Sequence, residues 1–284
     1  FGTNSVEVWY SSGNADFPLT RIQGAFNELG CAAPYSIAKM DNGLFWLGRD
    51  ARGQGMVYRA NGYTGQRIST HAVEWQIQRY GDLSDTIGYT YQQDGHSFYV
   101  LVFPSANTTW VYDVATQEWH ERAGFVDGAF TRHRGECQAF FNNNTVIGDH
   151  ENGNIYSYDL TNYSDNGTPQ KWLRSWRALP TGQNNLKRTA QHSLQLDVES
   201  GVGLNTGQGS DPQVMLRWSD DGGHTWSNEH WTSIGKIGEY GRRAIWRRLG
   251  MTMKLRDRVY EVSGTDPVKI AIMGAEIVVG GTNA

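Results

Sequence analysis

Proline and cysteine are scarce in this chain of 284 residues, which contains 7 prolines and 2 cysteines. Cys31 and Cys137 lie far apart and match no metal-ligand spacing. The sequence therefore shows no disulfide framework and no cysteine-based metal site, and it fits a protein made in a reducing cytoplasm. Long apolar runs are also missing. The longest candidate, residues 268–280, is interrupted by Lys269 and Glu276 and is shorter than the roughly 20 residues of a spanning helix. We therefore expect no membrane insertion.

The chain also lacks a strong charge of either sign. It has 25 Lys and Arg against 29 Asp and Glu, which gives a formal net charge of −4. Such a balance gives no general attraction to nucleic acid or to a membrane surface, so contact with either must be local. An initiating Met is missing as well. Residues 1–10 resemble a strand already in progress, and we expect the chain to be a fragment of a longer protein.

Glycine and aromatic residues are abundant, with 34 Gly, 11 Trp and 14 Tyr. Many short strands joined by Gly, Asn and Asp turns, with aromatic rings packed on the sheets, give this composition. The sequence predicts an all-β fold. One helix is expected near Ser69 or Thr70, because Val73, Ile77 and Tyr80 follow at helical spacing.

A loose internal repeat relates three segments, residues 41–62, 94–119 and 142–172. Each contains a turn, an apolar strand, a loop, a strand with an apolar-Tyr pair and a second turn. The tyrosines Tyr58, Tyr112 and Tyr156 recur 54 and 44 residues apart, close to the spacing of about 40–50 residues that is typical of propeller blades. The repeat predicts β-propeller-like blades, about four before residue 185 including a partial first one. A generic meander of hairpins is the alternative.

Composition changes at residues 180–185, where Pro, Gly and Asn predict a linker. We therefore expect partial propeller blades over residues 1–185 and a separate β-rich module over residues 186–284. Longer alternating strands favour a β-sandwich-like C-terminal module. A final blade with its closing strand is the alternative.

The C-terminal module contains an Asp-box hairpin pattern, S-x-D-x-G-x-T-W, formed by Ser219, Asp221, Gly223, Thr225 and Trp226. Glycine takes positive φ in a tight turn at no steric cost, and Asp and Ser side chains hydrogen-bond the turn backbone. Asp-boxes recur on the outer turns of β-propellers, including sialidases, away from the catalytic pocket. The pattern therefore indicates fold rather than chemistry.

The sequence contains none of the common catalytic or cofactor motifs, and we predict no catalytic residues, no metal site and no cofactor. The polar segments 149–151 and 131–136 are interpreted as solvated loops. A sialidase would need an arginine cluster, a Tyr–Glu pair and an acid/base Asp, and nothing indicates which residues would converge.

A run of cations is the strongest local departure from the overall acidity. Seven of them fall between residues 242 and 258 with only Asp257 opposing them: Arg242, Arg243, Arg247, Arg248, Lys254, Arg256 and Arg258. Intramolecular ion pairing, for example with Glu239, is one interpretation. A subunit interface or contact with a polyanion such as DNA is the other, and the interface is favoured.

The chain resembles the packaged-DNA stabilisation proteins of short-tailed phages and their prophages. Residues 215–229, 235–240 and 245–250 look like the C-terminal signature of that family, and similar upstream segments are residues 7–10, 15–18, 30–36, 44–48, 68–72 and 110–113. Members of the family are longer at the N-terminus.

This resemblance implies a non-enzymatic tail component made in the host cytoplasm and located in the virion tail, as the nozzle or hub. Such proteins assemble as a ring, usually of six, beneath the portal and its adaptor ring, and close the channel for genomic double-stranded DNA. Tail needle, fibre or spike proteins attach to them. The family has no catalytic residues that could be assigned to positions in this sequence. Two alternatives remain: a sialidase-like propeller glycosidase, and a glycan-binding module that uses surface rings such as Trp75 or Trp231 to recognise a receptor.

Overall fold

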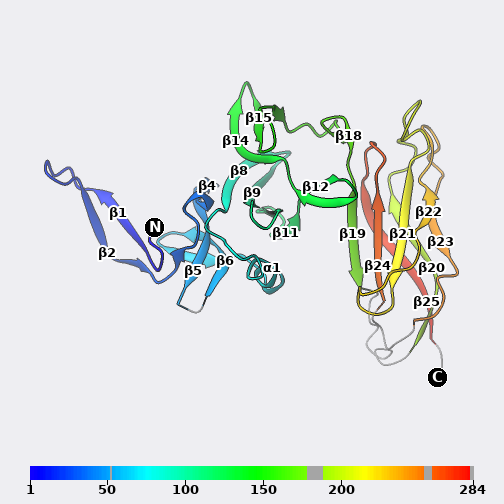
Figure 1. The fold of residues 1–284 in the computed structure, drawn as a ribbon, viewed down its shortest axis with the longest axis horizontal. Coiled ribbons are helices and arrows are strands. Elements are labelled where there is room, and N and C mark those ends of the chain that lie inside the picture. Colours follow the sequence, from blue (N-terminus) through cyan, green and yellow to red (C-terminus); the bar gives the residue numbers. More distant parts are fainter. Residues whose placement is uncertain (52, 178–187, 253–257, 282–284) are drawn as a thin grey trace. The chain divides into compact units, whose positions relative to one another are not determined.

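The computed structural model describes residues 1–51, 53–177, 188–252 and 258–281. The chain forms two compact units, Phe1–Tyr158 and Asp159–Ala284 (Figure 1). Strands dominate both, which confirms the all-β prediction. The helical segments in the described ranges are the short turn η1 (Pro34–Ser36) and the helix α1 (His71–Ile77).

The first unit is built from consecutive antiparallel blades. The first blade contains β4 (Ala38–Met40), β5 (Gly43–Asp50), β6 (Gly53–Asn61) and β7 (Thr64–Arg67), and β3 (Gly30–Cys31) also pairs with β5. The second contains β8 (Ile87–Gln93), β9 (His96–Phe103), β10 (Thr108–Asp113) and β11 (Glu118–Glu121). The third contains β14 (Gly135–Phe141), β15 (Asn144–Asp149) and β16 (Ile155–Ser157). Two hairpins flank them, β1 (Val6–Ser11) with β2 (Leu19–Asn27) and β12 (Ala123–Val126) with β13 (Ala129–Arg132).

The blades are arranged as in a propeller. β4 packs against β8, and β8 packs against β14, so the first strands of successive blades are neighbours. The repeat in the sequence is confirmed, because Tyr58, Tyr112 and Tyr156 each lie on the third strand of a blade. The alternative of a generic meander of hairpins is therefore wrong for this segment.

The turn between the first and second strand of each blade has the same backbone. Both central residues have positive φ in all three turns: Asp41 and Asn42, Asp94 and Gly95, Asn142 and Asn143. Two-residue turns of this kind match the right-handed twist of the strands that they join. Asn, Asp and Gly are the residues that tolerate such angles, which explains why the repeat begins with them.

We expect Gly95→Ala to destabilise the first unit by about 1 kcal/mol, since Ala is strained at positive φ. Gly95 has φ +79°, and an added Cβ would meet no atom within 4 Å, so the effect comes from the backbone alone. Gly153→Ala is the matched control, because that glycine is equally open and is not at positive φ. Urea unfolding of the two variants measures the difference, and equal losses would contradict the assignment.

The cores of the blades lie between the sheets. Phe45 of the first blade and Tyr99 of the second are fully buried, with ring centroids 5.1 Å apart. The Tyr99 hydroxyl donates to the Ser36 carbonyl at 2.6 Å. The predicted helix is confirmed as α1, whose N-cap Thr70 accepts the Val73 amide. Tyr80 lies beyond its end.

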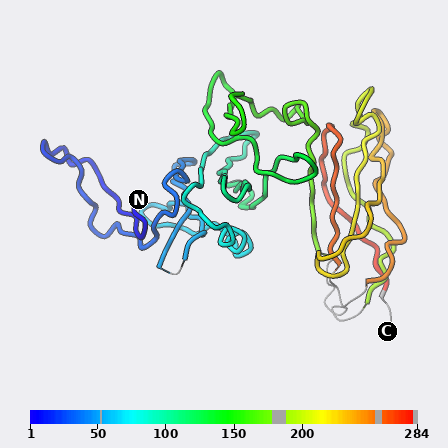
Figure 2. The backbone as a smooth tube through the Cα atoms, viewed as in Figure 1, coloured from blue at the N-terminus to red at the C-terminus, as the bar shows by residue number. Residues whose placement is uncertain are grey.

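The second unit is a sandwich of two antiparallel sheets (Figure 2). One has the order β19 (Trp172–Arg177), β24 (Val259–Gly264), β21 (Gln213–Ser219) and β22 (His230–Ser233). The other has the order β23 (Ala244–Arg247), β20 (Thr189–Val198) and β25 (Ile272–Gly281). Apart from these sheets, β17 (Ser164–Asp165) and β18 (Thr168–Pro169) form a short hairpin. Leu194 and Leu196 from one sheet pack with Leu216 and Val262 from the other.

The boundary between the two units lies N-terminal to residue 185, where the composition placed the end of the first domain. The division falls between Tyr158 and Asp159, and β19 pairs with β24 of the sandwich, so residues 172–177 belong to the second unit. The predicted linker, residues 180–185, lies outside the described residues. The local sequence does not indicate which strands pair when they are so far apart in the chain. A polar stretch that contains Pro, in contrast, is recognised locally as a loop.

Candidate interaction surface of the C-terminal unit

The arginine-rich segment surrounds β23. Ala244 and Trp246 point into the sandwich core, and Trp246 Nε1 donates to the His230 carbonyl at 2.8 Å. Ile245 and Arg247 lie on the opposite face, as strand alternation requires. The core residues of β23 therefore fix which way the neighbouring cations point.

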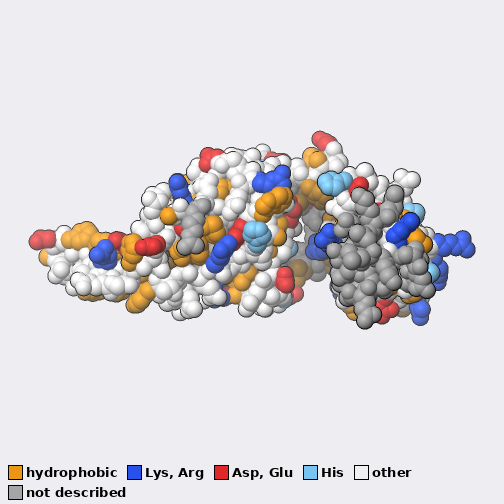
Figure 3. Space-filling view, turned by 90° about the horizontal axis from the view of Figure 1, so that it is seen from below, with side chains coloured by type: hydrophobic (Ala, Val, Ile, Leu, Met, Phe, Trp, Pro, Cys, Tyr) orange, Lys and Arg blue, Asp and Glu red, His pale blue; other side chains and the backbone are white. Residues whose placement is uncertain are grey.

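Four of the predicted cations are exposed: Arg242, Arg243, Arg247 and Arg248. Figure 3 shows several Lys and Arg side chains projecting from the C-terminal unit. Arg242 donates to the Ser233 carbonyl at 3.4 Å, while Glu239 accepts the Lys236 amide instead of an arginine. Arg243, Arg247 and Arg248 make no ion pair with a carboxylate in the described ranges. Among the residues that the structure describes, intramolecular ion pairing therefore does not account for these four exposed arginines, which we call the arginine surface.

Arg258 has a different environment, because its side chain is inside the sandwich. It is 1% exposed, and its guanidinium donates to both carboxylate oxygens of Asp220, at 2.7 and 2.8 Å. It also donates to the carbonyls of Leu249 and Met251. Burial by itself lowers the pKa of Arg258, but the hydrogen bonds to Asp220 and Tyr260 raise it above its usual value. As a candidate for an interface or DNA contact, Arg258 is corrected to a buried structural residue. Lys254 and Arg256 lie outside the described residues.

The turn after β21 is held by the side chains of the predicted pattern. Asp221 accepts the amides of His224 and Thr225 at 2.9 and 2.8 Å and the Thr225 hydroxyl at 2.7 Å. Ser219 accepts the Gly223 amide at 2.8 Å and donates to Asp221. These bonds close the turn on itself.

The hydrogen bonds from Ser219 and Thr225 hold the pKa of Asp221 well below its ordinary value. A carboxyl with a depressed folded pKa stabilises the fold above its unfolded pKa, which is about 4, and that stability is lost as the pH falls further. We therefore expect Asp221→Asn to be less stable than the native chain at neutral pH, with a difference that shrinks below about pH 4. Thermal unfolding from pH 7 to pH 3 measures it. A difference that is constant with pH would contradict this prediction.

Trp226 covers an ion pair on the outer face of the four-stranded sheet. Arg217 pairs with Glu261 across two strands, and the Trp226 ring lies 4.6 Å from the Arg217 guanidinium carbon. The ring lies over the guanidinium and contributes a cation–π contact. The turn therefore has a structural role, because it places the Trp226 ring over Arg217.

The polar segments of the first unit are satisfied internally. Asp149, predicted as part of a loop, ends β15 and accepts hydrogen bonds from Arg134, Asn152 and Tyr156. In the other segment, desolvation lowers the pKa of His133 to about 3, and its Nδ1 accepts the Gly135 amide at 3.0 Å. His133 is therefore neutral at physiological pH and has a structural partner.

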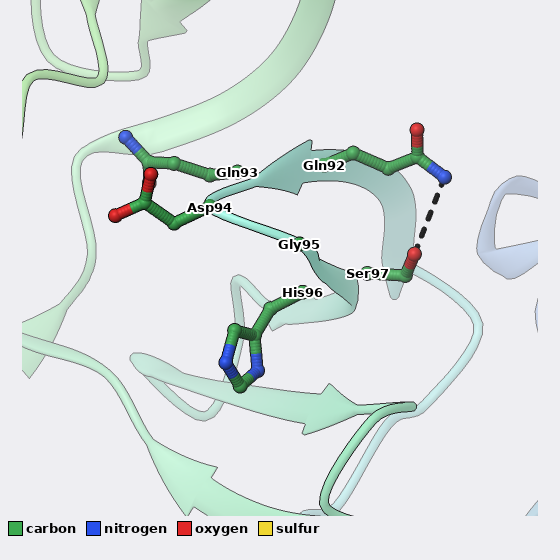
Figure 4. Close-up of a pocket in the computed structure, with 6 residues that line it drawn as sticks. All are labelled: Gln92, Gln93, Asp94, Gly95, His96 and Ser97. Carbon is green, nitrogen blue, oxygen red and sulfur yellow. Dashed lines mark hydrogen bonds between the residues drawn. The ribbon is translucent and has the colours of Figure 1, made fainter.

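A solvent-open hollow of about 320 Å³ lies at the β8–β9 turn, lined by residues 92–97 (Figure 4). Its side chains diverge: Gln92 and Ser97 bond to each other on one side, and His96 points away from both. Gln92 and Ser97 also donate to Asp41 of the preceding blade, and His96 pairs with Asp113 at 2.7 Å. The hollow lacks the convergent arginines and carboxylates of a sialidase site.

In the ranges that the structure describes, no group of three or more His, Cys, Asp or Glu residues is placed to hold a metal ion. Within the same ranges, no helix has the length and apolar character needed to cross a membrane.

Comparison with protein families decides what these two units are. Residues 1–163 match the family described as "Bacteriophage P22 Gp10, beta-propeller", and residues 171–280 match "Bacteriophage P22 Gp10, beta-sandwich". The chain belongs to the bacteriophage P22 Gp10 family. The propeller-like and sandwich-like predictions are confirmed, and the chain is that of a phage structural protein. Membership in the Gp10 family favours a non-enzymatic virion component.

Other comparisons add little to the Gp10 assignment. A search of curated proteins gave no match. One similar solved structure is an exo-β-1,3-galactanase from Phanerochaete chrysosporium, at 11% identity and TM-score 0.20, with 96% of this chain and 65% of that chain covered. Another is a family 43 arabinoxylan arabinofuranohydrolase from Bacillus subtilis, at 9% identity and TM-score 0.19, with 93% and 55% covered. This chain thus spans less than two thirds of either structure's length. The TM-scores are too low to support a functional argument.

Proposed function

We propose that this protein is a nozzle or hub component of a short-tailed phage tail. In this role it closes and extends the DNA channel below the portal and its adaptor ring and helps to retain packaged DNA. It also provides attachment for a distal needle, fibre or spike. Membership in the Gp10 family supports this proposal, because the match covers both units of the chain.

The arginine surface is the observation that carries the proposed assembly. In the described part of the chain, Arg243, Arg247 and Arg248 make no ion pair, so their guanidinium groups are available to a carboxylate of another subunit. Many phosphate contacts would make DNA adhere to a channel through which it must pass, whereas a mildly acidic protein lets it slide. We therefore assign the arginine surface to contact between copies in a ring rather than to DNA.

Charge reversal tests this assignment. We expect multi-angle light scattering over a concentration series to show a discrete oligomer of the 31.9 kDa chain. The double variant Arg243→Glu and Arg247→Glu should shift the mass toward the monomer. Arg49→Glu is the control, because Arg49 is an exposed arginine of the first unit. A chain that stays strictly monomeric at high concentration would contradict the proposal.

A further inference from the structure

The outer face of the sheet β23-β20-β25 carries opposite charges at its two edges. The pairing register forms rows across this sheet, with Arg247, Ser193 and Val278 in one row. Ile245, Gln195 and Glu276 form another. The row between them, Trp246, Leu194 and Ile277, faces the sandwich core. Arg247 at the β23 edge and Glu276 at the β25 edge are therefore on the same, exposed face.

Arg247 and Glu276 do not pair within the chain. The central strand β20 separates them, which places their backbones about 10 Å apart across the sheet. They also lie in different rows. In the described ranges neither side chain forms an ion pair. Two complementary charges are thus held apart on one sheet, each available to another molecule.

β25 also has the properties of an edge strand that is covered in an assembly. It is a ten-residue strand that pairs with β20 on one side, and no described strand pairs with its other side. Several of its apolar side chains are exposed: Ile272, Met273, Val278 and Val279, with Met273 at 70% and Val278 at 56%. Proteins usually shorten, charge or cover an edge of this kind, because it otherwise associates with other chains.

We propose that β25 of one copy packs beside β23 of the next copy, so that Glu276 pairs with Arg247 of its neighbour. This inference rests on the proposed ring and names the two surfaces that meet in it. The contact is head-to-tail, since one copy supplies the acidic, apolar edge and the other supplies the basic edge. A contact of this type, repeated around an axis, closes into a ring when the rotation permits. A two-fold contact between two β25 strands would leave the arginine surface without a partner.

A charge exchange tests the contact. We expect Arg247→Glu and Glu276→Arg each to weaken self-association at least tenfold, since each brings like charges together. The double variant, Arg247→Glu with Glu276→Arg, should return the dissociation constant to within threefold of the native chain. Sedimentation velocity over a concentration series measures all four proteins. Val278→Lys adds a charge to the apolar edge and should weaken association while the Arg247–Glu276 pair is intact.

The possible results distinguish a failure of the β25–β23 contact from a failure of the proposed ring. If the native chain forms the oligomer and both single variants keep it, this contact is wrong while the ring remains. If the native chain does not associate at all, the proposed function itself fails. Loss of association in both single variants without recovery in the double variant also overturns the direct pairing. The three residues are on the outer face, so an unchanged melting temperature serves as the folding control.

Discussion

Replacing Arg258 by alanine is expected to lower the free energy of unfolding of the C-terminal unit by about 3–5 kcal/mol. The guanidinium is 1% exposed, and it donates to Asp220 and to the carbonyls of Leu249 and Met251. Its removal leaves a carboxylate and two carbonyls without their donor. A whole domain is stable by only about 5–15 kcal/mol, so this single change removes a large part of the total.

Arg247→Ala is the matched control, because it removes the same side chain from an exposed position in the same unit. We expect its effect to be within about 0.5 kcal/mol. Native-state hydrogen exchange of the β24 amides in the full chain reports the stability of the sandwich separately from the blades. A loss below about 1 kcal/mol for Arg258→Ala would show that the buried network is not needed for stability.

Replacing Phe45 by alanine should destabilise the first unit by about 3–5 kcal/mol, since a fully buried ring leaves a cavity that the neighbours fill only in part. Phe45 contacts Tyr99 of the next blade, with the centroids 5.1 Å apart. The change therefore removes packing between blades as well as within one. Urea unfolding of the full chain measures the loss of unfolding free energy. Native-state hydrogen exchange of the β9 amides then shows that the loss lies in the first unit.

Phe140→Ala is the control for this experiment, because Phe140 is 69% exposed on the third blade. It should change the free energy of unfolding by less than about 0.5 kcal/mol. Equal effects of the two substitutions would contradict the packing of the first blade on the second.

The blade repeat could be predicted from local residues because each blade begins with a tight turn. Two positive φ angles in succession favour Asn, Asp or Gly, so the pairs Asp41-Asn42, Asp94-Gly95 and Asn142-Asn143 mark the same turn three times. The apolar strands that follow pair with the nearest segments in the chain. Such local pairing leaves a regular spacing in the sequence, and the spacing indicated the propeller.

The local sequence does not indicate which arginine between residues 242 and 258 is buried. Arg247 and Arg258 are the same residue type in one charged run, yet Arg247 is exposed and Arg258 is buried. The difference comes from Asp220, which lies in a distant turn and accepts two hydrogen bonds from Arg258. No spacing in the sequence indicates that this turn and residue 258 meet.

The sequence by itself determined the strand-rich class, the blade period, the turn chemistry and the resemblance to a phage family, since these depend on residues close together in the chain. Only the tertiary structure decided where the units divide, which arginine is buried, and that Arg247 and Glu276 share one face. Each of these depends on strands that are far apart in sequence, such as β19 with β24 and β20 with β25. Their pairing is fixed by burial of a common core, and the free energy of that burial belongs to the folded chain as a whole.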